Sequence, residues 1–460
     1  MYQLDWDKPG KGYFIGIGGI SMSGFARLLQ KEGFQISGSD RSPSSITTEL
    51  ERAGIAVSYV QDGSSLTGDF DFVVYTSAIS PDNPEFQKAR SLNLPMMERG
   101  ELVGQVMLQY KTAVAVAGTH GKTTTTSITS HIMLEAGFDP TISVGGILPA
   151  IQGNMRIGNS EYFIAEACEY TNSFLKFHPT MGIILNIEAE HLDFFQDLQD
   201  IRNSFRRFAS LIPSHGVLAI NADIPDYEEI IEGLTCHVIT YSANDESADF
   251  YATDILFDSA GCPTFTLVIK GEKKDTYHLS IPGKFNISNA LGSLCLAYDW
   301  GVDPASIQTA FDSYHGTNRR FQKKGEYNGA VVIDDYAHHP TEIAATLDAA
   351  TSYPHRKLYV AFQPHTYSRT KAFLTDFAKV LSAADTVLLA DIYAARETDD
   401  LQISSKDLAH EMKKLGADVH YLGSFEAIEN FLKKNLLPND MLITMGAGNI
   451  VDVGESLLKE

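Results

Sequence analysis

A short segment of the sequence combines the residue types that bind the phosphates of a nucleotide. Residues 118–125 read GTHGKTTT and follow an apolar run at 112–117. Glycines permit turns that direct backbone N–H groups at phosphate, a lysine neutralises the β and γ charges, and a hydroxyl binds Mg²⁺. Val116 replaces the first glycine of the strict phosphate-loop spacing, which leaves a plain glycine turn before a threonine-rich helix as the alternative. The residues expected to bind a nucleoside triphosphate are Gly118, Thr119, His120, Gly121, Lys122, Thr123 and Thr124.

Two later apolar runs end in acidic residues and a histidine, which are possible metal ligands. Residues 162–165 lead into Glu166, with Glu169 three residues further, and residues 181–187 lead into EAEHLD, which contains His191. The carboxyl ends of parallel strands gather at one edge of a sheet, so we expect these side chains near the phosphate-binding segment. Carboxylate, imidazole and hydroxyl groups are plausible Mg²⁺ ligands there. The expected metal ligands are Thr123, Glu166 and His191.

A second glycine turn lies near the N-terminus, after the apolar run at 13–17. Gly18 and Gly19 follow the run, Ser21 occupies the third glycine position of a dinucleotide fingerprint, and Asp40 ends the next strand pattern. A partial fingerprint is weak evidence for NAD, and a diphosphate at the start of a helix fits equally well, so a UDP-sugar is an alternative ligand. The residues grouped in this substrate site are Gly18, Gly19, Ser21, Asp40, Thr76 and Ser77.

Three polar segments follow apolar runs in the last third of the chain. They read DDYAHHP at 334–340, QPHTYSRT at 363–370 and DIYAARE at 391–397. A zinc site of His338, His339 and His365 is disfavoured, because adjacent histidines on an extended segment point to opposite faces. Arg319 and Arg320 precede these segments, either as a solvated pair or as a clamp on a γ-phosphate.

The elements that must position these residues alternate between short apolar runs and helical periods, as in α/β proteins. Two strand–glycine turn–helix units, at about residues 13 and 112, open two domains, and four apolar runs after residue 316 form another β/α unit. The stretch 251–269 alternates in polarity and suggests an antiparallel edge. We therefore expect three α/β domains at residues 1–110, 111–315 and 316–460, the outer two being Rossmann-like.

Composition excludes several classes of protein. The 460 residues are 44% hydrophobic and 20% charged, which is typical of a folded globular chain. The formal charge of −22 disfavours nucleic acid and an anionic membrane as partners. Four scattered cysteines and no signal-like apolar stretch favour a cytoplasmic location. Cys168 has no evident paired base and is interpreted as a packing residue. The oligomeric state is not predicted.

Seven segments in order along nearly the whole chain resemble the Mur ligases. They read GIGGISMSGFA, GTHGKTTTTS, NIEAEHLD, RRFQ, DDYAHHPTE, FQPHTYSRT and DIYAARE. The resemblance implies a UDP-binding N-terminal domain, a central ATPase-type domain and a Rossmann-like C-terminal domain. It also implies ATP and Mg²⁺ as cofactors.

The resemblance implies a role for particular residues. Lys122 would bind the β and γ phosphates, Arg320 would approach the γ-phosphate, and Asp335 would help hold the nucleotide. Asn286 looks like the asparagine of the family that contacts adenine. Three departures are Ser21 for glycine, Phe285 for histidine before Asn286, and Glu166-Ala167-Cys168-Glu169 for the common EADE, which leaves open which glutamate is the main metal ligand. The residues that would accept the incoming amino acid are Tyr336, His338 and Arg369.

The implied reaction is ATP-dependent ligation of L-alanine to the carboxylate of UDP-N-acetylmuramate through an acyl phosphate. The residues that would act on the reacting groups are Lys122, Arg320 and His191, the last as a possible base. The nearest alternative is the ligase of the same family that attaches a recycled tripeptide, and DDYAHHPTE with FQPHTYSRT favours alanine. Two alternatives from other classes are a nucleotide-gated switch protein and an NAD-dependent oxidoreductase.

Overall fold

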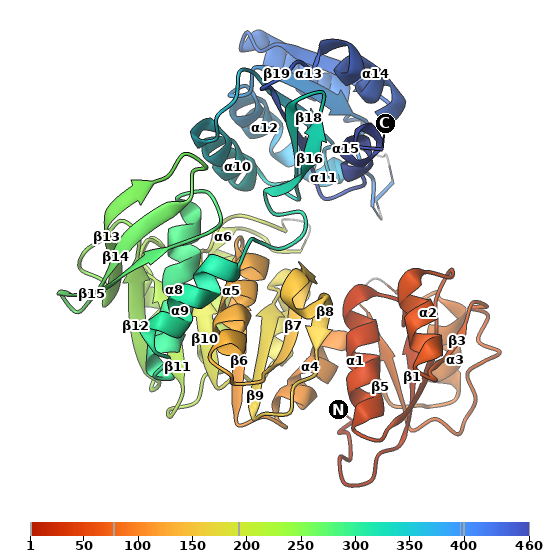
Figure 1. Cartoon of the computed structure of the whole chain (residues 1–460). Helices are drawn as coiled ribbons and strands as arrows, with labels where there is room; N and C mark the ends of the chain where they lie inside the picture. Colours follow the sequence, from red (N-terminus) through yellow and green to blue (C-terminus); the bar gives the residue numbers. More distant parts are fainter. Residues whose placement is uncertain (1, 77–78, 192–193, 396, 399–400, 460) are drawn as a thin grey trace. The chain divides into compact units, whose positions relative to one another are not determined.

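The chain forms three β-sheets flanked by helices in a computed structural model that describes residues 2–76, 79–191, 194–395, 397–398 and 401–459 (Figure 1). It divides into two compact units, which are Met1–Phe250 with Gly292–Ile307 and Tyr251–Leu291 with Gln308–Glu460. The predicted α/β architecture with three sheet-bearing parts is confirmed. No helix in the described ranges is long and apolar enough to cross a membrane.

The N-terminal sheet is parallel, with the strand order β3-β2-β1-β4-β5. The central strand β1 is buried from Gly12 to Ile15, as expected for a strand covered on both faces. Helix α1 follows the glycine turn directly, and its residues from Met22 to Ala26 are buried. The elements are β1 (Lys11–Ile15), α1 (Ile20–Lys31), β2 (Gln35–Ser39), α2 (Ser45–Arg52), β3 (Ala56–Ser58), β4 (Phe72–Tyr75), α3 (Pro84–Ser91), β5 (Met96–Glu98) and α4 (Arg99–Met107).

The second sheet is built around β6, which lies between β9 and β10 and runs parallel to both. Within the first unit its order is β12-β11-β10-β6-β9-β7-β8, with β8 antiparallel to β7. Small and β-branched residues fill β6, whose sequence TAVAVA is buried from Ala113 onward. The elements are β6 (Thr112–Ala117), α5 (Lys122–Glu135), β7 (Thr141–Leu148), η1 (Pro149–Ile151), β8 (Gly153–Arg156), β9 (Tyr162–Ala167), η2 (Tyr170–Lys176), β10 (Met181–Ile184), α6 (Leu198–Ala209), β11 (Val217–Asn221), α7 (Glu228–Ile231) and β12 (His237–Ser242).

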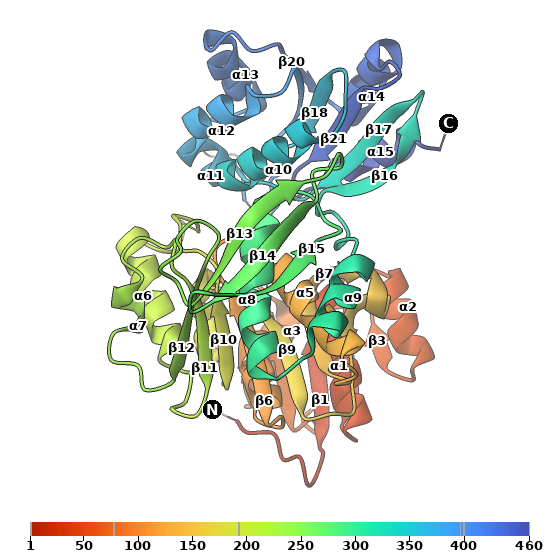
Figure 2. The ribbon, with the colours of Figure 1, turned by 60° about the vertical axis from the view of Figure 1, so that its left-hand side comes forward.

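The predicted run 181–187 is shorter in the structure, because β10 ends at Ile184 and the next residues turn toward the phosphate-binding segment. The stretch 251–269 forms two strands, and a third strand pairs antiparallel with the second at the edge of the sheet, as the alternating pattern suggests (Figure 2). Two helices follow this antiparallel part. The elements are β13 (Phe250–Phe257), β14 (Pro263–Ile269), β15 (Glu272–His278), α8 (Phe285–Asp299) and α9 (Pro304–Ser313).

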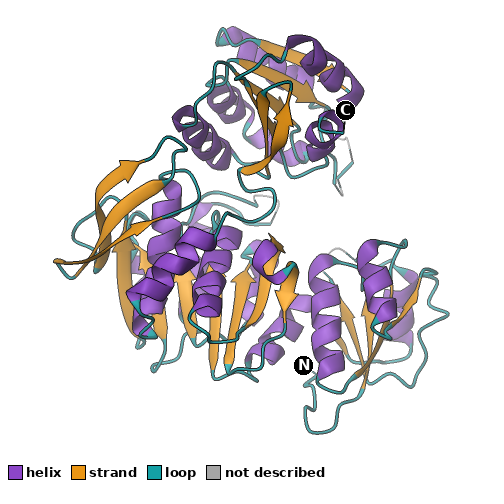
Figure 3. Ribbon diagram, viewed as in Figure 1, coloured by secondary structure: helices purple, strands orange, loops and turns teal. Residues whose placement is uncertain are grey.

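The C-terminal sheet has the order β16-β17-β21-β18-β19-β20 and is parallel except at β16 (Figure 3). Alternate residues of its strands enter two apolar cores, so that Val332 and Ile333 lie on opposite faces. Strand β21 lies between β17 and β18, which places the loop after it between the loops after those two strands. The elements are β16 (Gln322–Tyr327), β17 (Ala330–Asp335), α10 (Pro340–Ser352), β18 (Leu358–Phe362), α11 (Tyr367–Ala372), α12 (Leu374–Leu381), β19 (Thr386–Ala390), α13 (Ser405–Lys414), β20 (Val419–Gly423), α14 (Phe425–Asn435), β21 (Met441–Met445) and α15 (Val451–Leu457).

Candidate active site

The segment 118–123 forms the turn between β6 and α5, as the sequence predicts. Gly121 precedes the first residue of α5 with a φ of 81°, a conformation that favours glycine. Gly118 approaches β10 so closely that a Cβ atom there would lie 2.8 Å from Cβ of Leu185. Both glycines are therefore required by the turn, and the absent first glycine of the strict spacing falls inside the strand at Val116.

Lys122 forms an ion pair with a buried carboxylate. Its Nζ lies 2.9 Å from Oε2 of Glu169, and it donates to the backbone carbonyls of Gly118 at 2.6 Å and Thr119 at 2.9 Å. Glu169 is 1% exposed. Burial by itself would lower the pKa of Lys122, but the Glu169 carboxylate raises that pKa above its usual value. Lys122 is thus a fixed positive charge at the start of α5.

The two candidate glutamates have different partners. Glu166 lies within β9, where its Oε2 accepts hydrogen bonds from Thr123 Oγ1 at 2.8 Å and from the Gly145 N–H at 2.9 Å. Glu169 follows the strand, and its Oε1 lies 3.9 Å from Nε2 of His191. The assignment of Glu166 and His191 as metal ligands stays a prediction, and on this side of the turn His191 forms an ion pair with Glu169. Four donors of metal-binding type, from Thr123, Glu166, Glu169 and His191, surround the turn.

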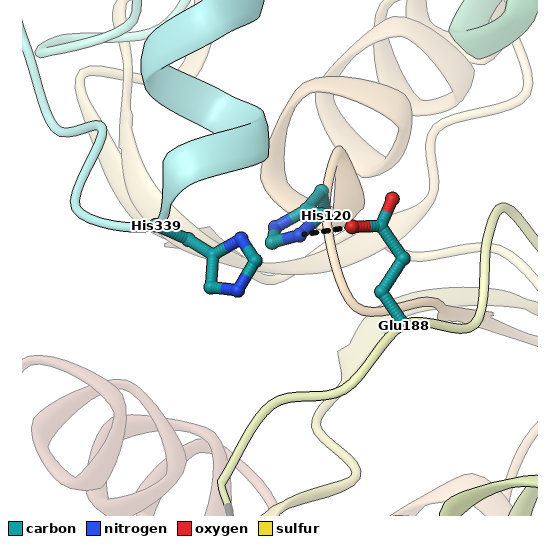
Figure 4. A group of neighbouring side chains, drawn as sticks. All are labelled: His120, Glu188 and His339. Carbon is teal, nitrogen blue, oxygen red and sulfur yellow. Dashed lines mark ion pairs between the residues drawn. The ribbon is translucent and has the colours of Figure 1, made fainter. Parts of the chain in front are cut away.

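Asn186 holds the phosphate-binding turn from the neighbouring strand. Its Oδ1 accepts the His120 N–H at 2.7 Å, and its Nδ2 donates to the His120 carbonyl at 3.1 Å. The Thr119 N–H donates to the Asn186 carbonyl, and Nε2 of His120 lies 3.5 Å from Oε2 of Glu188 (Figure 4). The His120 N–H, which the sequence predicted to bind phosphate, is therefore already bonded to Asn186. The N–H groups of Gly121 to Thr124 are the ones left to bind phosphate. The only sequence signal for the role of Asn186 was its place near the end of the apolar run at 181–187.

Cys168 is partly buried and lies between the two glutamates in the sequence. Burial raises the pKa of its thiol to about 11, with a further contribution from Glu169. A thiol with so high a pKa is protonated at neutral pH and is a poor nucleophile. The interpretation of Cys168 as a packing residue agrees with this environment.

The N-terminal glycine turn brings Gly18 and Asp40 together. The Gly18 N–H donates to Oδ2 of Asp40 at 2.8 Å, and Ser21 in the first turn of α1 accepts a hydrogen bond from Nη1 of Arg99 at 3.3 Å. Arg99 is a cation beside the turn that sequence analysis missed, since it lies 78 residues away and no local pattern marks it. Thr76 follows β4 at the same edge of the sheet, and Ser77 lies outside the described residues.

A buried carboxylate lies beneath this glycine turn. The backbone carbonyl of Ser39 accepts the N–H groups of Gly16 and Ile17, and its hydroxyl donates to Glu85. Glu85 also accepts the Tyr13 hydroxyl at 2.7 Å and is fully buried. Burial raises the pKa of Glu85, although the two hydroxyl donors oppose the shift.

Asn286, the expected adenine contact, is buried at the start of α8. Its Nδ2 donates to the Pro282 carbonyl at 2.7 Å, and its Oδ1 accepts from Nδ2 of Asn289 at 3.0 Å. Phe285, which replaces the usual histidine, is 39% exposed and packs beside Gly283. The side chain of Asn286 is therefore held in one orientation.

Asp335 ends β17 in the C-terminal sheet, and Tyr336 follows it. Asp335 accepts the N–H groups of Phe321 and Ala337, each at 2.7 Å. Burial raises the pKa of Asp335 to about 6, and Arg320 opposes the shift. The guanidinium of Arg320 lies 5.4 Å from the centre of the Tyr336 ring and 4.0 Å from Oε1 of Glu342.

The predicted amino-acid residues come together at the carboxyl edge of this sheet. The rings of Tyr336 and His338 lie 5.4 Å apart, and those of His338 and His365 lie 5.8 Å apart. Arg369 Nη1 lies 3.1 Å from Nδ1 of His365. His339 packs instead on Phe373 and accepts the Thr341 N–H, away from the other two histidines as its neighbouring position on an extended segment predicts.

Three family models match the chain in succession. They are the Mur ligase family catalytic domain at residues 11–111, the Mur ligase middle domain at 116–297 and the Mur ligase glutamate ligase domain at 319–448. The chain belongs to the Mur ligase family. The predicted resemblance is thereby confirmed.

Curated relatives match this Mur ligase over its whole length. A UDP-N-acetylmuramate–L-alanine ligase of Agathobacter rectalis is 56% identical over 460 residues, and one of Lachnospira eligens is 54% identical over 459, with all of both chains covered. The crystal structure of UDP-N-acetylmuramate-alanine ligase MurC from Thermotoga maritima has a TM-score of 0.82 at 26% identity and covers 98% of each chain. A murein peptide ligase from Psychrobacter arcticus, at 24% identity and a TM-score of 0.72, shares the fold.

Proposed function

We propose that this Mur ligase joins L-alanine to the carboxylate of UDP-N-acetylmuramate, with conversion of ATP to ADP and phosphate, in the synthesis of peptidoglycan precursors. The observation that carries the proposal is the 56% identity, over the full length of both chains, to a relative with that name. Such a match covers the sugar-nucleotide, ATP and amino-acid parts of the chain together.

The carboxylate of the sugar nucleotide attacks the γ-phosphorus of ATP, and an acyl phosphate and ADP form. The amine of L-alanine then attacks the acyl carbon, the amide bond forms and phosphate leaves. Phosphoryl transfer is catalysed chiefly by positioning and charge neutralisation. Lys122 supplies charge at the start of α5, where the N–H groups of Gly121 to Thr124 face outward, and we assign Arg320 to the γ-phosphate, Asn286 to adenine and Asp335 to the nucleotide.

The residues around Lys122 fit a magnesium ion. The hydroxyl of Thr123, the carboxylates of Glu166 and Glu169, and the imidazole of His191 are the donor types that bind Mg²⁺ beside a nucleotide. Bound there, Mg²⁺ would neutralise phosphate charge that develops during transfer. Glu169 also holds Lys122, so this carboxylate serves both the ion and the lysine.

We assign the sugar nucleotide to the N-terminal turn and L-alanine to the C-terminal sheet. The Gly18 and Gly19 N–H groups bond to Asp40 and to the Gly16 carbonyl, so we assign the diphosphate to the N–H groups at the start of α1, where Arg99 adds a positive charge. At the C-terminal sheet, Arg369 offers a planar guanidinium for the carboxylate of a free amino acid. Tyr336 and His338 lie beside it.

Release of phosphate tests the proposal. With ATP, Mg²⁺ and UDP-N-acetylmuramate present, we expect phosphate release only after L-alanine is added, together with formation of the alanyl product by mass spectrometry. The preformed tripeptide serves as the competing acceptor. Ligation of the tripeptide in preference to L-alanine would assign the recycling reaction instead, and phosphate release independent of any amino acid would exclude a ligase.

A further inference from the structure

Two adjacent arginines, Arg319 and Arg320, lie just before the C-terminal sheet and have different neighbours. Arg319 has a positive φ of 64°, in the left-handed region of the backbone. Its Nε donates to Oδ2 of Asp334 at 2.9 Å, and Asp334 is fully buried. The nearest carboxylate recorded for Arg320 is Glu342, 4.0 Å away. Arg319 is therefore the arginine that is fixed to the sheet.

The other two nitrogens of Arg319 hold the loop after β21. Nη1 donates to the Gly448 carbonyl at 3.0 Å, and Nη2 donates to the Gly446 carbonyl at 2.7 Å. A guanidinium has a rigid planar fork of donors, so this pair of bonds fixes the loop in orientation as well as in distance. A lysine carries the same charge but cannot make this set of contacts.

Arg319 also holds Tyr336 from two sides. The Tyr336 N–H donates to the Arg319 carbonyl at 2.7 Å, and the Arg319 guanidinium lies 4.9 Å from the centre of the tyrosine ring. A cation over an aromatic face is attracted by the negative charge of the ring centre. The ring of Tyr336 is thus fixed by the residue that also fixes Gly446 and Gly448.

The loop that Arg319 holds lies between the two halves of the predicted amino-acid site. Strand β21 pairs with β17 on one side and with β18 on the other. Tyr336 and His338 follow β17, while His365 and Arg369 follow β18. Gly448 packs against Tyr393 and the side chain of Gln363, where a Cβ atom would lie 2.9 Å from Cγ of Tyr393 and would overlap Oε1 of Gln363.

We propose that Arg319 is the positioning residue of the amino-acid site, which it builds by fixing Tyr336 and the loop Gly446–Gly448 against the end of β17. This inference rests on the proposed ligase function. We assign no phosphate contact to Arg319, whose Nε and two Nη atoms hold Asp334, Gly448 and Gly446. Its loss displaces the groups that receive L-alanine and leaves ATP binding intact.

The test compares two arginines that each bind a fully buried aspartate of the same sheet. Arg356 lies 2.8 Å from Asp440 at the opposite edge, where the strands begin, so Arg356→Lys is the matched control for Arg319→Lys. We expect Arg319→Lys to raise the Michaelis constant for L-alanine on the order of 10- to 100-fold, because small displacements of positioned groups have effects of this size. The constant for ATP should change less than about threefold, and Arg356→Lys should leave both unchanged.

A purely structural role for Arg319 would give a different result. In that case both variants would lose thermal stability and neither would change the Michaelis constant for L-alanine, which would overturn the proposal. A larger change in the Michaelis constant for ATP than in that for L-alanine would also overturn it. Gly448→Ala is a second probe, since it displaces the loop with Arg319 intact, and an unchanged constant for L-alanine there would also overturn it. The wild-type enzyme tests the ligase function separately, by phosphate release that depends on L-alanine.

Discussion

The N-terminal glycine turn and the phosphate-binding turn of the middle domain have the same local structure. In each, a glycine turn joins a buried strand to a helix, and a buried glutamate lies beside the turn. The two glutamates have different hydrogen-bond partners. Glu169 is paired with Lys122, whereas Glu85 receives the hydroxyls of Tyr13 and Ser39. A lysine held by a glutamate is a charge available to a phosphate, while neutral hydroxyls fix only the shape of the turn. The comparison supports the proposed assignment of phosphoryl transfer to the turn with Lys122 and of binding alone to the N-terminal turn.

The largest effect is expected at Lys122. Lys122→Ala should lower kcat by roughly 10³-fold or more, because it removes a charge that acts on the phosphoryl group in the transition state. The measurement is phosphate release at saturating substrates. Lys111→Ala is the control, since Lys111 is an exposed lysine directly before β6, and it should retain full activity. Half of the activity remaining in Lys122→Ala would show that this turn does not act on phosphate.

The second effect concerns the two glutamates beside the phosphate-binding turn. Glu169→Gln should raise the Mg²⁺ concentration for half-maximal activity by about tenfold or more, since Glu169 contacts both His191 and Lys122. Glu166→Gln should have the smaller effect, because Glu166 is bound to Thr123 and the Gly145 N–H. Magnesium titrations of activity measure both variants. The reverse order would return the main ligand to Glu166.

The third effect belongs to the N-terminal turn and should change binding without changing chemistry. In Gly18→Ala the new Cβ would lie 2.7 Å from both Oδ2 of Asp40 and Cγ2 of Thr47, so the turn must shift. We expect the Michaelis constant for UDP-N-acetylmuramate to rise about tenfold with kcat nearly unchanged. Gly68→Ala, where nothing lies within 4 Å of the added Cβ, is the control. A large fall in kcat would remove the distinction between the two turns.

The smallest effect is on stability and depends on pH. Burial raises the pKa of Glu85 in the folded state, so the folded chain binds this proton more tightly than the unfolded chain. The stabilising contribution is complete below the unfolded pKa and is lost as the pH rises through the folded pKa. Each unit of difference corresponds to about 1.4 kcal/mol.

Glu85→Gln removes this titration. Its thermal midpoint relative to wild type should therefore rise between pH 4.5 and pH 8, as measured by calorimetry. Glu49→Gln, on the exposed face of α2, should follow wild type at every pH. A constant difference between Glu85→Gln and wild type across this range would contradict the assignment.

Much of the fold follows from local sequence. The apolar runs at 358–362 and 441–445 coincide with strands β18 and β21, because each strand is buried along its length. The domain boundaries at 110/111 and 315/316 stay predictions. Strand β10 ends three residues before its apolar run does, since Asn186 bonds to Thr119 and His120 of the phosphate-binding turn instead of continuing the ladder.

The position of polar side chains in the fold was predictable where they follow an apolar run, as at Lys122 and Asp335, while their roles stay predictions. Contacts between distant segments were not. Arg99 reaches Ser21 across 78 residues, and Arg319 reaches Gly448 across 129, with no periodicity or motif to mark either pair. The choice between Glu166 and Glu169 depends on the path of the chain after β9, where Thr171 and Asn172 have positive φ values of 55° and 56°. Sequence spacing alone does not predict such a turn.

The hydrogen bonds of Lys122 have a consequence for the catalytic cycle. An ammonium group has three protons, and the carbonyls of Gly118 and Thr119 and the carboxylate of Glu169 accept all three. In the proposed function, a phosphate that binds this lysine must replace one of these acceptors. The contact therefore exchanges one hydrogen bond of the lysine for another, and its net contribution to binding is smaller than that of a lysine with an unused proton.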